Sequence, residues 1–256
     1  MIQNFYTIFN TIELTFFNWF LAFFAAFLLG IGKAGIKGIG IVIVTIMAIV
    51  FGGKQSTGIL IPLMVVADIF AVIYYHRHTQ WNYLIKLLPT MVIGVLLGVW
   101  LGKYISDEVF KQLMAILILC IVVFMFYMEY KKSNEIPTSK VFSNGIGLLS
   151  GFTSMIGNLA GSFANIYFLA MRLPKNQFIG TAAWLFFIIN VFKLPFHIFV
   201  WKTVTQKSLI TDLFLIPGIV IGFIIGVKLV KVINNNQYRK FILIITAIGA
   251  LLILLK

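Results

Sequence analysis

The stretch Gly30-Ile-Gly-Lys-Ala-Gly-Ile-Lys-Gly-Ile-Gly40 decides how the rest of this chain is interpreted. It holds five glycines and two lysines, Lys33 and Lys37, between the apolar runs 12–29 and 41–51. Glycine at this density weakens a helix and lets the backbone approach another backbone or a ligand closely. A lysine within an apolar frame needs an anion, a counter-charge or water. The stretch is therefore either an ordinary loop between two membrane helices or half of a binding site.

The composition is that of an integral membrane protein. Of the 256 residues, 61% are hydrophobic and only 11% are charged, whereas a soluble domain keeps roughly a quarter of its residues charged. Alternating apolar and polar residues are absent from the apolar runs, so the expected spans are helices.

The charge balance points to a lipid bilayer as the partner and not to nucleic acid. The formal net charge is +13, and the lysines lie mostly at the ends of apolar runs, where anionic headgroups and orientation rules account for them. One cysteine and three histidines are too few and too scattered for a metal cluster. We expect no metal and no cofactor.

The apolar runs fall into two similar sets. In each half, two short segments are followed by three runs long enough to span a bilayer. The short pairs are 12–29 with 41–51 and 141–152 with 163–171, and the expected spans are 57–75, 83–102, 110–127, 180–197, 209–230 and 241–255.

An internal repeat relates these two sets. The sequence Pro89-Thr-Met-Val-Ile-Gly94-Val-Leu-Leu-Gly98 returns as Pro217-Gly-Ile-Val-Ile-Gly222-Phe-Ile-Ile-Gly226, 128 residues later. Gly58 and Asp68 correspond to Gly180 and Asn190 at a spacing of 122. The pattern predicts a first transmembrane repeat over 1–130, a cytoplasmic linker over 131–140 and a second repeat over 141–256.

The expected fold class is an all-α polytopic membrane protein. If each short pair is broken or re-entrant, dipping in and returning, each half crosses three times and the two repeats are inverted. The basic linker then lies in the cytoplasm, as the positive-inside rule prefers. If the short segments cross fully, the repeats are parallel. We favour inversion.

Paired short segments in corresponding halves of a transporter indicate its binding site. Half-helix N-termini offer free backbone N–H groups and partial positive charge to an anion. Gly35 and Gly38 would let the backbone approach the ligand in the first half. Hydroxyl and amide side chains would donate hydrogen bonds to it in the second, although such small residues also suit helix packing. These are Thr153, Ser154, Asn158 and Ser162.

Charged residues inside the expected spans are the other candidates. Asn190, Lys193 and His197 are spaced to share one helix face. We expect Lys193 to face a water-filled cavity and bind the anion, with a lysine snorkelling to the interface as the alternative.

Asp68 is the acid deep within a span. It serves either as a structural ion-pair partner for a lysine or as a titrating group that couples proton movement. His197 is a second, less favoured proton carrier, and Asp212 is expected at the interface.

Several of these segments resemble the TauE/SafE sulfite exporter family, also called the toluene-sulfonate-uptake permeases. The similarity includes residues 30–40, Leu60-Ile-Pro-Leu-Met-Val-Val-Ala-Asp-Ile-Phe70, Gly151-Phe-Thr-Ser-Met-Ile-Gly-Asn158 and Phe187-Ile-Ile-Asn-Val-Phe-Lys-Leu-Pro195. Thr45 departs from it, since relatives often carry proline there. The resemblance implies a multi-pass carrier in the bacterial inner membrane for small sulfur-containing or organic anions, such as sulfite, thiosulfate or sulfonates.

The residues and the resemblance together favour a secondary anion carrier that works by alternating access, with or without proton coupling. An uncoupled anion channel would use the same basic pore. A cation or metal permease would use Asp68 with the histidines His76, His78 and His197. We expect no enzyme, because no nucleophile–base pair stands out.

Overall fold

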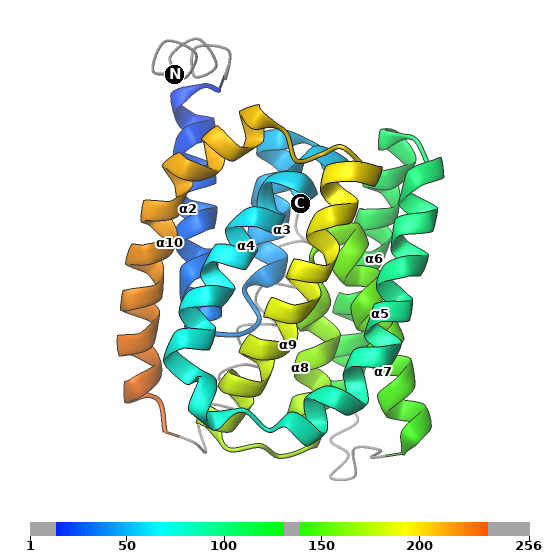
Figure 1. The fold of residues 1–256 in the computed structure, drawn as a ribbon, viewed down its shortest axis with the longest axis vertical. Coiled ribbons are helices and arrows are strands. Elements are labelled where there is room, and N and C mark those ends of the chain that lie inside the picture. Colours follow the sequence, from blue (N-terminus) through cyan, green and yellow to red (C-terminus); the bar gives the residue numbers. More distant parts are fainter. Residues whose placement is uncertain (1–13, 131–138, 235–256) are drawn as a thin grey trace.

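The protein is a bundle of helices, described here by a computed structural model for residues 14–130 and 139–234 (Figure 1). The helices are α2 (Phe16–Lys33), α3 (Gly40–Phe51), α4 (Gly53–Tyr75), α5 (Trp81–Tyr104), α6 (Asp107–Tyr130), α7 (Lys140–Gly157), α8 (Ala160–Ala170), α9 (Lys175–Pro195) and α10 (Gln206–Val232), with a 3₁₀ turn at His76–His78 and a π-helical turn at Phe196–Val200. The expected all-α class is confirmed, and no strand occurs in these two ranges.

Five of these helices are long and apolar enough to cross a membrane. They are Phe16–Lys33, Gly53–His78, Trp81–Tyr104, Lys175–Val200 and Gln206–Val232. Four coincide with expected spans. The expected span 110–127 falls within α6, a continuous helix of 24 residues, whereas the expected span 241–255 and most of the linker lie outside the described residues.

The first helix differs from the expectation of a short segment. α2 has 18 residues and enough apolar side chains to count among the five candidate spans. It nevertheless ends beside the middle of a longer helix, because Gly30 packs against Gly222, about halfway along α10.

Local sequence signals explain where several helices begin. Thr15 and Ser139 cap the starts of α2 and α7, where their hydroxyl oxygens accept hydrogen bonds from the backbone N–H groups of Asn18 and Phe142. Thr205 and Ser208 form a reciprocal capping box at the start of α10. Such caps satisfy N–H groups that have no partner inside the helix.

α2 and α10 cross at a contact made by glycines. A Cβ on Gly30 would lie 2.2 Å from the carbonyl oxygen of Ile219, and a Cβ on Gly222 would lie 2.0 Å from the carbonyl oxygen of Phe27. Only the absence of both side chains lets the two backbones come this close. This is the role that small residues have where membrane helices pack.

α5 and α7 cross through the same kind of contact. A Cβ on Gly151 would lie 1.8 Å from the carbonyl oxygen of Met91, and one on Gly94 would lie 2.1 Å from that of Leu148. Gly94 corresponds to Gly222 in the sequence repeat. The first helix of each half therefore packs on a helix of the other half, through equivalent glycines.

Two partly buried lysine contacts follow the same correspondence. Lys54 at the start of α4 donates to the carbonyl oxygen of Gly102 near the end of α5. Lys175 at the start of α9 donates to the carbonyl oxygen of Val230 near the end of α10. Cations stabilise helix C-termini, where carbonyl groups lack intrahelical partners.

α4 and α9 lie side by side and antiparallel at the centre. The side chain of Gln55 near the start of α4 donates to the carbonyl oxygen of Thr203, just beyond α9. At the other end, the Thr79 hydroxyl donates to the carbonyl oxygen of Gly180 near the start of α9. α2 and α3 therefore lead into α4 from one face of the bundle, whereas α7 and α8 lead into α9 from the opposite face (Figure 1).

Candidate functional site

Two breaks between helices, one in each half, form the candidate site. Residues 34–39 connect α2 to α3, with Gly35 and Gly38 at φ +129° and +100°. These are conformations that side chains disfavour and glycine adopts readily. Asn158 ends α7 in the left-handed region, at φ 56°. Asparagine tolerates that region better than most residues, so each break uses a residue suited to its backbone.

Each break delivers a helix N-terminus without a side-chain cap. Ile39 precedes α3 and Leu159 precedes α8, and neither side chain makes a capping hydrogen bond. The first N–H groups of a helix have no partner inside it. These two N-termini therefore carry backbone donors and partial positive charge that an anion can use.

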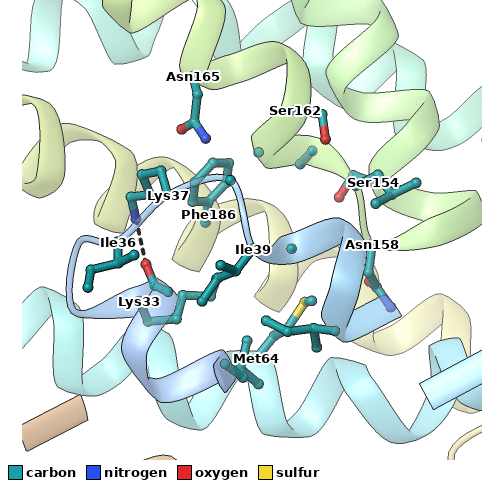
Figure 2. A pocket seen from close by; sticks show the side chains of 18 of the residues that line it. Lys33, Ile36, Lys37, Ile39, Met64, Ser154, Asn158, Ser162, Asn165 and Phe186 are labelled. Atoms are coloured by element: carbon teal, nitrogen blue, oxygen red, sulfur yellow. Dashed lines mark hydrogen bonds between the residues drawn. The ribbon is translucent and has the colours of Figure 1, made fainter. Parts of the chain in front are cut away.

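Both N-termini open into one cavity of about 120 Å³ (Figure 2). Ile39 and Gly40 of the first break and Ala160 and Gly161 of the second line it. Its polar lining comes from both halves of the chain and consists of Lys33, Lys37, Ser154, Asn158, Ser162, Asn165 and Asn190, among apolar side chains that include Met64 and Phe186.

Two lysines give the cavity its positive side. The ammonium groups of Lys33 and Lys37 lie 5.1 Å and 5.8 Å from the centre of the Phe186 ring, within range for a cation–π contact. Lys37 Nζ also donates to the carbonyl oxygen of Gly32 at 3.2 Å, the dashed line in Figure 2. Phe186 and a backbone carbonyl therefore hold Lys37 at the cavity.

Asp68 lies behind this positive side and is tied to two lining residues. Lys33 Nζ donates to Asp68 Oδ1 at 2.5 Å, and Asn190 Nδ2 donates to Asp68 Oδ2 at 2.6 Å. Asp68 is 0% exposed. The ion pair joins α2 to α4, and the hydrogen bond from the Asn190 side chain joins α9 to α4.

Lys193 has a corresponding place behind the second break. Its ammonium group donates at 2.8 Å to the Ser154 carbonyl oxygen and at 2.8 Å to Asn158 Oδ1. Lys193 is 0% exposed and does not line the cavity. It holds Asn158 from α9, while Asn158 Nδ2 donates to the carbonyl oxygen of Thr57 on α4.

The structure brings most of the candidate residues together and leaves some apart. The residues that line the cavity are Lys33, Lys37, Gly38, Ser154, Asn158, Ser162 and Asn190, whereas Gly35, Thr153, Asp68, Lys193 and His197 do not line it. Thr153 donates to the carbonyl oxygen of Leu149 in its own helix. His197 is buried, and its Nδ1 pairs with the Thr203 hydroxyl at 2.9 Å.

One acid expected at the interface is buried instead. Asp212 is 4% exposed, and neither carboxylate oxygen has a hydrogen-bond partner within the described ranges. Asp212 lies about two turns after the N-cap Thr205 in α10, a helix that packs against α2 and α4.

Sequence reasoning missed an aromatic and an amide residue of the lining, Phe186 and Asn165. Phe186 is one of 26 phenylalanines in the chain, so nothing in its own identity distinguished it. Asn165 is the lone amide of the short segment 163–171, so its polarity within an apolar run was the available signal.

Comparison with known families identifies the family of the chain. The family model described as sulfite exporter TauE/SafE matches residues 19–253 of the chain. No curated protein and no solved structure matches it. The match covers both breaks and every residue that lines the cavity, so the chain belongs to the TauE/SafE sulfite exporter family of membrane transporters.

Proposed function

We propose that this protein is a secondary transporter that moves a small sulfur-containing or organic anion across the bacterial inner membrane. Candidate substrates are sulfite, thiosulfate and sulfonates such as sulfoacetate. The observation that carries the proposal is the cavity into which two uncapped helix N-termini and two lysines converge. Backbone N–H groups, Lys33 and Lys37 all favour negative charge.

The charges around the cavity favour an anion over a cation. Three buried lysines, Lys33, Lys37 and Lys193, lie at the cavity lining or directly behind it. Among the described residues, the one carboxylate that is bonded to the lining is that of Asp68. Both carboxylate oxygens of Asp68 already accept hydrogen bonds from protein groups. A cation permease would instead need acceptor oxygens that face its ion.

We further propose that residues 1–130 and 141–256 form an inverted repeat around this site. Support comes from the antiparallel pair α4 and α9, and from the equivalent crossings of α2 on α10 and α7 on α5. Inverted repeats with broken helices at their interface suit alternating access. This favours a carrier over a channel with a permanently open path.

Asp68 is the proposed site of proton coupling. A proton on Asp68 removes the charge that holds Lys33, so the Lys33 ammonium becomes available to the anion. Proton binding and anion binding then favour each other, which is the requirement for coupled movement. His197 is a less favoured proton carrier, because its ring lies outside the cavity lining and pairs with the Thr203 hydroxyl.

The proposal is tested by uptake into proteoliposomes. The purified protein is reconstituted and offered labelled sulfite, thiosulfate, sulfoacetate or sulfate, with and without a pH gradient. At least one of the first three should accumulate. Transport of a divalent metal with no anion uptake would overturn the proposal.

A pair of lysine variants assigns the activity to the cavity. Lys37→Ala should raise the half-saturating anion concentration about 10- to 100-fold, since a hydrogen bond to a charged group contributes about 1.5–3 kcal/mol. Lys86→Ala is the control, because Lys86 is exposed on α5 and does not line the cavity. Equal effects of the two substitutions would place the binding site elsewhere.

A further inference from the structure

Asn165 is a polar side chain of the cavity that the proposed mechanism does not use. It lies in the second turn of α8, is 8% exposed and lines the cavity. Figure 2 shows its side chain pointing from α8 toward the part of the cavity where Lys37 and Phe186 lie. Its chain neighbours Ala164 and Ile166 are apolar. An amide buried in such surroundings is costly unless it finds a partner.

The two ends of this amide have different surroundings. Oδ1 is fully covered and has no hydrogen-bond partner within the described ranges. Nδ2 is not covered, and no described residue accepts a hydrogen bond from it. An amide nitrogen can donate two hydrogen bonds. The side chain of Asn165 therefore presents a donor to the cavity and keeps its acceptor away from it.

The other two asparagines of the lining use their amide nitrogens within the protein. Asn158 Nδ2 donates to the carbonyl oxygen of Thr57, and Asn190 Nδ2 donates to Asp68 Oδ2. Both amides therefore connect helices. Among the described residues of the lining, Asn165 is the asparagine whose donor stays available to a ligand.

This donor lies beside the start of α8. A helical side chain leans toward the N-terminus of its helix, over the residue four positions earlier. That residue is Gly161, where a Cβ would lie 3.6 Å from Asn165 Nδ2. Because glycine has no side chain, this flank of the nitrogen stays open. It adjoins the uncapped N-terminus of α8, whose residues Ala160 and Gly161 also line the cavity.

We propose that Asn165 binds the transported anion by donating hydrogen bonds from Nδ2 to its oxygens. With the N-terminus of α8 it forms the share of the site that the second half contributes, while Lys37 holds the anion from the first half. The amide is uncharged, so it strengthens binding without adding another buried positive charge. This inference rests on the proposed function and adds to it a substrate-binding residue.

Binding of thiosulfate and of sulfoacetate to the full-length protein in detergent tests the inference. Titration calorimetry at neutral pH measures the dissociation constants. Asn165→Leu removes the donor at similar volume and should raise the dissociation constant about 10- to 100-fold, the range for a hydrogen bond to a charged group. Asn144→Leu is the control, because Asn144 is exposed on α7 and does not line the cavity. It should leave the affinity unchanged.

A stability measurement separates a binding role from a structural one. Without an anion, Asn165→Leu should unfold at the same temperature as wild type or higher, because it removes a buried oxygen that has no partner. A side chain that only supports the fold would instead lower the unfolding temperature and the affinity together. Asn165→Asp keeps the shape but replaces the donor with a negatively charged acceptor, so it should weaken binding more than Asn165→Leu does.

The outcomes separate this inference from the proposed function. An unchanged dissociation constant in Asn165→Leu, or binding as tight as wild type in Asn165→Asp, would overturn the role of Asn165 alone. A weaker affinity in Asn165→Leu that comes with a lower unfolding temperature would also overturn it. If the wild-type protein binds neither probe and no sulfite, the proposed function fails first and the inference falls with it.

Discussion

The buried ion pair between Lys33 and Asp68 gives the sharpest prediction about this molecule. The two groups lie 2.5 Å apart and join α2 to α4. The Asp68 side chain is 0% exposed and that of Lys33 is 11% exposed. We consider Lys33→Met, Asp68→Asn and the variant that carries both substitutions. Methionine keeps the length of the lysine side chain without its charge, and asparagine keeps the shape of the aspartate.

Each single substitution leaves the opposite charge buried without its partner. Breaking a buried pair in this way destabilises a protein by about 3–5 kcal/mol. The double substitution removes both charges, and replacing a whole buried pair by uncharged groups is often close to neutral. We therefore expect the double variant to be more stable than either single variant, within about 1–2 kcal/mol of wild type.

The assay is equilibrium unfolding in mixed micelles, following helix content as the denaturing detergent increases. The four proteins form a double-mutant cycle, which measures the coupling between the two side chains directly. If the double variant lowers the free energy of unfolding by the sum of the decreases in the two single variants, Lys33 and Asp68 act independently. That result would refute the buried pair on which the coupling mechanism depends.

The same variants test the proton step. If the proposed coupling through Asp68 and Lys33 is right, anion uptake should rise as the external pH falls. Asp68→Asn resembles the protonated state permanently, and its uptake should be independent of the pH gradient. Gradient-driven uptake that persists in Asp68→Asn would assign proton movement to another group and leave Asp68 a structural role.

Two further predictions concern packing. Gly222→Ala should destabilise the protein by about 1–3 kcal/mol, because its Cβ would overlap the Phe27 carbonyl oxygen. The control Gly145→Ala, with open space around the residue, should be neutral or stabilising by up to about 1 kcal/mol. Unfolding in mixed micelles measures both variants, and equal stability of the two would contradict the crossing of α2 and α10. Lys193→Met should leave the Ser154 carbonyl and Asn158 Oδ1 without their donor, and so lower the free energy of unfolding by about 2–4 kcal/mol. A variant as stable as wild type in the same unfolding assay would refute these contacts.

The helices could be predicted from sequence because apolar runs and their breaks are local signals. The repeat was visible for a related reason, since glycines at four-residue spacing mark a contact face. What the spacing of Gly94 and Gly98 could not show was the partner of that face. α5 packs on α7, the first helix of the other half, and this choice depends on how the whole bundle assembles.

The candidate site was partly predictable for similar reasons. Glycines and lysines in an apolar frame marked the first break, and the polar residues after Gly151 marked the second. The place of Lys193 could not be read from its spacing, because a helix face shared with Asn190 does not say which of them meets the cavity. Phe186 and Asn165 act as single residues without a pattern, so only the folded chain shows their neighbours.

The reciprocal crossings also determine when this protein can finish folding. Gly30 enters the membrane early in synthesis, but Gly222, the residue it packs against, follows about 190 residues later. Until α10 is made, Gly30 lacks the backbone that it packs against in the folded protein. The cavity takes its lining from both halves of the chain, so a chain truncated before α8 lacks the residues of the second break.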